Sequence, residues 1–144
     1  MKHQADLALT LLSLQRAGLP LRRAELSIVL VDDKKMLALN TEHRGVDKTT
    51  DVLSFPMYNT MKEFPKEGEF LLGDIIINTD WIYSELDPHD SPEAVTAEVI
   101  KHSRRLLIHA LLHLLGYDHE IDAQHDRAMK KKEVELLNAL KKMD

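Results

Sequence analysis

The sequence predicts a single α+β domain over residues 1–144, in which a small mixed β-sheet packs among surrounding helices. Three observations predict this class. The length of 144 residues fits one domain. Short apolar, β-branched runs typical of strands alternate with longer segments whose apolar residues recur at helical spacing. No repeat or linker divides the chain, so helices and strands are expected to share one core.

The composition excludes several classes of site. The chain has no cysteine, which rules out a thiolate nucleophile, a cysteine-ligated metal and a disulfide-linked partner. Its formal net charge is −5, so the surface as a whole does not attract polyanions. Any contact with nucleic acid would need a local basic patch.

The first segment, residues 3–20, is predicted to be an amphipathic helix that Gly18 and Pro20 end. Its leucines at positions 7, 11 and 14 recur at helical spacing. The apolar run resembles a signal peptide, but Asp6 directly precedes it and no cleavage pattern follows. No run approaches the ~20 apolar residues that span a membrane, so we expect a cytoplasmic protein without membrane contact.

Strands and helices then alternate. Residues 25–32 are apolar and β-branched and predict a core strand, and residues 33–44 predict a helix. Residues 51–57 predict a strand at an edge of the sheet, because Pro56 cannot donate to a ladder. The aperiodic residues 58–69 predict a loop.

The second half begins with residues 70–82, which predict a strand pair or a bulged strand broken at Gly73. A long helix follows, with Asp90 and Glu93 as a capping box. It is expected to run to Leu115 and to stop at Gly116, a natural left-handed cap. Residues 122–143 predict a final amphipathic helix.

Three histidines gather at the end of the long helix. His109 and His113 are four residues apart, so their side chains lie on one face of the helix, one turn apart. Gly116 can take the positive φ that lets the chain double back, which brings His119 toward the same point. This spacing predicts a metal site on the helix and the loop after it.

Three neutral imidazoles without a thiolate favour Zn²⁺, although other first-row metals remain open. Three protein ligands leave a fourth position free, as in catalytic zinc sites. A structural zinc would need a fourth ligand, which Asp118 or Glu120 could supply. Alternatively, these two carboxylates orient the imidazoles or cap the helix.

The long helix also carries a polar stripe, which predicts that it lines a cleft. The stripe comprises Glu98, His102, Arg105, His109 and His113, all within an arc of roughly 80° at about 100° per residue.

The histidine spacing is shared with the metzincin proteases. Those enzymes place a general-base glutamate directly after the first histidine, and this chain has Ala110 there. The protease hypothesis therefore lacks its main chemical group.

Three motifs together resemble the YbeY family of bacterial rRNA-maturation factors. They are "HALLHLLGYDH" (109–119), "LNTEHRGVDKTTDVLSFP" (39–56) and "LGDIII" (72–77). Two departures from the family pattern are Ala110, where the family usually has glycine, and Thr49, where it usually has proline. The threonine at position 49 is expected to affect the stiffness of the loop more than the chemistry of the site.

The resemblance implies an α+β fold, zinc on the three histidines, and single-strand-specific endoribonuclease activity. It also implies action on ribosomal RNA and the small ribosomal subunit, in rRNA processing and ribosome quality control. We expect Arg44 and His113 to be catalytic, and Arg44 and Arg105 to bind the substrate, since a guanidinium group offers a planar fork to phosphate. Lys48, Lys101 and Arg104 could extend a positive track.

Two alternatives stay open on the residues alone. One is a metallohydrolase of another substrate class, such as peptides or small molecules. The other is a ribosome-associated binding module whose metal is structural. No residue is an obvious general base.

Overall fold

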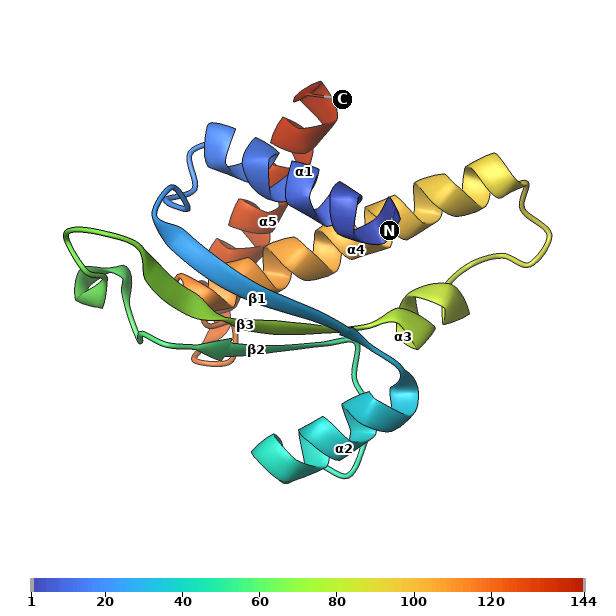
Figure 1. The fold of residues 1–144 in the computed structure, drawn as a ribbon, viewed down its shortest axis with the longest axis horizontal. Helices are drawn as coiled ribbons and strands as arrows, with labels where there is room; N and C mark the ends of the chain where they lie inside the picture. The colour runs from blue at the N-terminus through green and yellow to red at the C-terminus, as the bar shows by residue number, and fades with distance from the viewer. Residues whose placement is uncertain (1, 144) are drawn as a thin grey trace.

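A three-stranded mixed sheet forms the centre of the molecule, as a computed structural model of residues 2–143 shows (Figure 1). The strand order is β1 (Ala24–Val31), β3 (Phe70–Asn78), β2 (Val52–Pro56). β1 pairs with β3 in parallel and β2 pairs with β3 antiparallel. The predicted α+β class with a small mixed sheet is confirmed, and β2 lies at an edge, as its proline requires.

Helices cover both faces of this sheet. Their bounds are α1 Lys2–Arg16, α2 Asp33–Arg44, α3 Thr79–Ser84, α4 Pro92–Leu114 and α5 Ala123–Met143, with a 3₁₀ turn η1 at Met61–Glu63 inside the predicted loop. α1, α4 and α5 lie on one side of the sheet and α2 lies on the other (Figure 1). Over residues 2–143, none of these helices is long and apolar enough to cross a membrane.

α4 is the central helix of the core. Leu107, Leu111 and Leu114 are completely buried along it, and they pack in one cluster with Ile75 and Ile77 from the middle strand. Burying one such side chain contributes about 1.5–3 kcal/mol. The helix that carries the histidines is therefore held firmly against the sheet.

The start of α4 differs from the predicted capping box. The cap is Ser91, whose hydroxyl oxygen accepts a hydrogen bond from the backbone N–H of Ala94 at 3.2 Å. Pro92 is the first helical residue, where its missing N–H costs nothing. Asp90 was the wrong choice because it lies one residue too early to reach the first free N–H groups.

Two strand predictions also need correction. β1 lies at an edge of the sheet and none of its residues is fully buried, although Leu26, Ile28 and Leu30 pack against the core from that edge. The strand over 70–82 ends at Asn78, whose side-chain oxygen accepts from the backbone N–H of Trp81 at 3.3 Å and caps α3. The bulge is confirmed, because Leu71 and Gly73 oppose the consecutive residues Glu25 and Leu26 of β1.

Buried Asn78 also anchors the loop between α2 and β2. Its side-chain amide donates to the carboxylate of Asp33 at 2.6 Å, to the carbonyl of Thr50 at 3.0 Å and to the hydroxyl of Thr49 at 3.2 Å. The Thr49 hydroxyl in turn donates to Asp33 at 3.2 Å. Thr49 thus ties the loop by hydrogen bonds. The start of α2 and the segment before β2 are thereby held together at the end of β3.

Candidate metal centre

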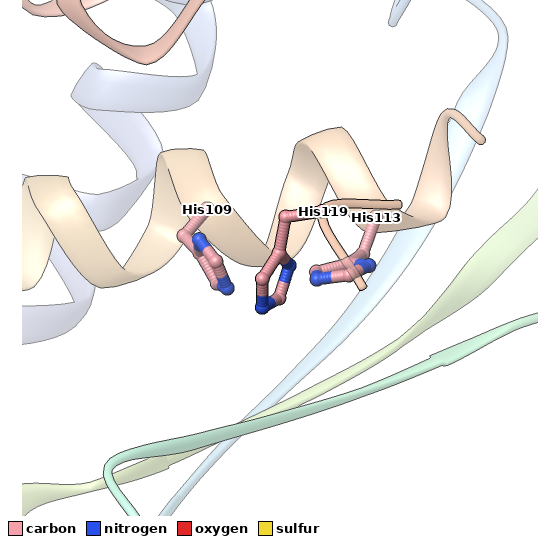
Figure 2. A group of neighbouring side chains, drawn as sticks. All are labelled: His109, His113 and His119. Carbon is pink, nitrogen blue, oxygen red and sulfur yellow. The ribbon is translucent and has the colours of Figure 1, made fainter. Parts of the chain in front are cut away.

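His109, His113 and His119 converge on one point. The two helical histidines project from the same side of α4, and His119 reaches back between them from the segment after the helix (Figure 2). One ligand nitrogen from each ring lies within 4.8 Å of the others, and the ring centroids are 5.0–5.2 Å apart. The three side chains can hold one metal ion.

The chain reversal that delivers His119 is a Schellman motif. Gly116 has a φ of +102°, a conformation that residues with a Cβ resist. Its N–H donates to the carbonyl of His113 at 3.0 Å, and the N–H of Tyr117 donates to the carbonyl of Leu112 at 2.9 Å. These two bonds satisfy carbonyl groups that the helix end would otherwise leave unpaired. The predicted left-handed cap at Gly116 is confirmed.

The surroundings keep the second histidine in the form that binds metal. Burial, followed by the neighbouring His109 and His119, lowers the pKa of His113, and Asp118 and Glu120 oppose that shift. A metal ion binds the neutral imidazole and not the imidazolium. The Nδ1 atom of His119 is buried and has no hydrogen-bond partner within residues 2–143, a cost that a bound cation would offset.

A carboxylate that the sequence analysis missed contacts the centre. Oε1 of Glu133 lies 2.9 Å from Nδ1 of His109. Glu133 belongs to α5 and falls on the same helical stripe as the buried Met129, Leu136 and Leu140. The sequence signal that could have identified Glu133 is a carboxylate within the apolar stripe of this helix. Among the described residues, Asp118 and Glu120 form no hydrogen bond with an imidazole of the centre, whereas Glu133 does.

The histidines open into a cavity of about 510 Å³. Strand β2, the end of α2, helix α4, the segment after it and α5 all contribute to its wall. The polar side chains in this wall are Arg44, Thr50, Asp51, Ser54, Arg105, His109, His113, Asp118, His119, Glu120 and Glu133.

The charges in this wall fit a bound cation. Four carboxylates, Asp51, Asp118, Glu120 and Glu133, face only two guanidinium groups, those of Arg44 and Arg105. Without a cation, the cavity has an excess of negative charge that repels an anionic substrate. A divalent ion on the three histidines compensates that excess, so the residues present fit a metal centre.

The structure brings together only part of the predicted cleft. Arg44 and Arg105 both line it, although their roles stay predictions. The upstream part of the polar stripe does not reach it, because His102 packs its ring against Trp81 at 6.0 Å and pairs with Glu98 at 3.4 Å.

The other predicted cations lie elsewhere. Lys101 and Arg104 line a separate hollow of about 440 Å³ between α4 and α5, and Lys48 is not part of the cavity wall. A continuous positive track through Lys48, Lys101, Arg104 and Arg105 is therefore not seen at this cleft.

Comparison with known proteins places the chain in a family. The sequence model of the family "Endoribonuclease YbeY" matches residues 2–141. The protein of that name from Wolinella succinogenes is 38% identical over 136 residues, covering 94% of this chain and 85% of the relative. The one from Aliarcobacter butzleri is 34% identical over 146 residues, covering 98% and 91%.

A solved structure shows the same fold. The solution structure of a Thermotoga maritima protein matches with a TM-score of 0.56 and 22% identity, covering 98% of this chain and 85% of that one. The family match spans the strands, the histidine centre and both long helices. The chain therefore belongs to the endoribonuclease YbeY family.

Proposed function

We propose that this chain is a zinc-dependent endoribonuclease that cleaves single-stranded RNA in the cytoplasm, with ribosomal RNA in the small subunit as its substrate. Family membership supports cleavage of RNA by hydrolysis. The proposal extends this to the metal, the strand preference, and a role in rRNA maturation and ribosome quality control. It is motivated by the three motifs that the chain shares with YbeY proteins.

One observation carries the proposal: three histidines and two arginines share a cavity that has too much negative charge to accept RNA without a cation. When bound, a zinc ion would supply Lewis acidity and acidify a water molecule toward pKa ~7. The metal would therefore have two roles: it would supply the chemistry, and it would offset the negative charge that opposes binding of a phosphate.

The protein side chains have separate tasks around that point. The guanidinium of Arg44 reaches the cavity from the end of α2 and offers two parallel N–H donors to a phosphodiester. Arg105, one turn before His109 on α4, offers a second guanidinium to the same cavity. Burial lowers the pKa of His113, which keeps its lone pair available as a ligand. We assign His113 and Arg44 to catalysis, and Arg44 and Arg105 to substrate binding.

The size of the cavity favours a single strand. A flexible strand can bend to place one phosphate between two arginines, whereas a rigid A-form duplex presents its backbone only at its surface. With few cations to neutralise phosphates, binding should depend only weakly on salt.

The test measures cleavage of a short single-stranded rRNA fragment, alone and annealed to its complement. We expect metal-dependent cleavage of the single strand only, and loss of cleavage in Arg44→Ala. Arg22→Ala is the matched control, since Arg22 is exposed and outside the cavity wall. RNA cleavage that remains in a His113→Ala preparation would reveal a contaminating nuclease.

Binding is measured in parallel with chelator-treated protein. The charge argument predicts that removal of the metal weakens RNA binding as well as cleavage. Equal cleavage of both RNA forms would contradict the strand preference. A metal-bound protein that binds the fragment without cleaving it would instead support a binding module with a structural metal.

A further inference from the structure

Helix α5 contributes one polar contact to the histidine centre. Glu133 is 24 residues beyond His109 in sequence, and the 2.9 Å contact between its Oε1 and the ring Nδ1 of His109 is the only hydrogen bond that any of the three histidine rings makes within residues 2–143. Both side chains are about one-third exposed or less, at 34% for His109 and 27% for Glu133. The pair lies in the cavity wall and is partly shielded from water.

This contact determines which nitrogen of His109 is free. An ionised carboxylate can only accept a hydrogen bond, so in the neutral ring the proton must sit on Nδ1. The lone pair is then on Nε2, the nitrogen on the far side of the ring from Glu133. The hydrogen bond therefore fixes both the tautomer of His109 and the rotation of its ring.

The contact is rigid because α5 is anchored on both sides of it. Met129 and Leu136 are 1% and 2% exposed, and they lie one turn before and one turn after Glu133 on the same stripe. The backbone that carries Glu133 cannot shift without opening this core contact. The carboxylate is thus held in place by packing and not only by its partner.

We propose that Glu133 is a positioning residue, which acts through His109 to hold the histidine centre ready for a metal ion. The inference rests on the proposed function only in so far as the three histidines bind metal, and it does not require that RNA be the substrate. It assigns α5 a role in the centre, beyond covering the sheet. Glu133 is not assigned a proton transfer of its own, since its Oε1 is already engaged by His109.

The test measures metal affinity without RNA, by competition of the purified apoprotein with a coloured chelator for Zn²⁺. Glu133→Ala removes the acceptor and should weaken affinity by about 10- to 100-fold. Glu133→Gln keeps an acceptor oxygen at the same place, so its affinity should fall between that of Glu133→Ala and the unmodified chain. Glu135→Ala is the control, because Glu135 is exposed on the same helix and pairs with Lys132 at 3.7 Å, away from the cavity wall.

Unfolding of the metal-free proteins distinguishes a loss of metal affinity from a general loss of stability. The inference predicts that Glu133→Ala and Glu135→Ala have similar stability without metal and differ in metal affinity. Equal affinity in the two alanine variants would overturn it. So would a Glu133→Gln protein that binds metal like the unmodified chain but has lost RNA cleavage, since that result makes Glu133 a proton-transfer group.

The same series separates this inference from the proposed function. If the unmodified chain binds metal but cleaves no RNA, while Glu133→Ala loses affinity, the proposed function fails and the positioning role stands. If the unmodified chain cleaves RNA and Glu133→Ala keeps full affinity, only the positioning role fails. An unmodified chain that binds no metal overturns both.

Discussion

Replacing Gly116 by alanine should damage the metal centre without removing any ligand. Gly116 has a φ of +102°, and a Cβ added there would lie 3.2 Å from the backbone oxygen of Asn59 and 3.6 Å from Cα of Thr60. The positive φ alone costs an L-residue about 1–2 kcal/mol. The first contact is also tighter than ordinary packing, so the reversal must shift by a few tenths of an ångström.

That shift acts directly on the third ligand. His119 is three residues beyond Gly116, and a metal site needs its ligands within about 0.5 Å of their productive positions. A shift of a few tenths of an ångström in the reversal takes up most of that margin. We therefore expect Gly116→Ala to lose about 1–2 kcal/mol of unfolding free energy and to bind Zn²⁺ about ten-fold more weakly, which corresponds to about 1.4 kcal/mol.

The chain contains a matched control for this variant. Gly18 ends α1 with a φ of +107°, and a Cβ there would meet nothing within 4 Å. It occupies the same position of a Schellman motif, since the N–H of Leu19 donates to the carbonyl of Leu14 and that of Gly18 donates to Gln15. Gly18→Ala therefore carries the same backbone strain far from the histidines.

The assay combines urea unfolding of the metal-free proteins with chelator competition for Zn²⁺. Both alanine variants should lose similar stability, and only Gly116→Ala should lose metal affinity. If the two variants bound Zn²⁺ equally well, the reasoning would be refuted, because the reversal at Gly116 would then not control the position of His119.

Three further predictions concern other parts of the centre and its support. Arg44→Lys keeps the charge but loses the planar fork, so kcat/KM on single-stranded RNA should fall about ten-fold. This loss corresponds to one charge-assisted hydrogen bond of about 1.5 kcal/mol. Unchanged kinetics would show that only the charge matters. Because burial lowers the pKa of His113 in the folded chain, the unfolded chain takes up this proton first as pH falls. The free energy of unfolding of the metal-free protein should therefore be retained above about pH 6.5 and decline below it, and urea unfolding of His113→Gln should show a smaller decline. Asn78→Asp places a carboxylate against Asp33, in place of an amide that donates to it at 2.6 Å. It should lower the free energy of unfolding by about 2–4 kcal/mol. Recovery of the melting temperature at acid pH would identify charge repulsion as the cause, and an unchanged melting temperature would exclude it.

Local sequence rules were sufficient for the histidine centre. Residues four apart on a helix must share a face, and a glycine after the last apolar turn is the residue that most readily takes a positive φ. His109, His113, Gly116 and His119 obey these rules within eleven residues, so their convergence needed no knowledge of the rest of the fold. The extents of α2, α4 and α5 followed for the same reason, to within one or two residues.

Local rules were less reliable where neighbouring residues compete. Asp90 and Ser91 are both residues that favour the N-cap position. Because the helix starts at Pro92, Ser91 is the N-cap. Residues 79–82 have the composition of a strand, yet the side chain of Asn78 caps a helix there. The apolar run of β1 indicated a core strand, but burial depends on the strand order, which places β1 at an edge.

Only the tertiary structure decided which residues complete the site. Arg44 comes from a helix on the far side of the sheet, and Glu133 comes from α5, 24 residues after its partner His109. His102 shares a helical stripe with His109 but turns to Trp81 on α3. Contacts between distant segments depend on how the helices pack on the sheet, and the spacing of residues within one segment does not encode that packing.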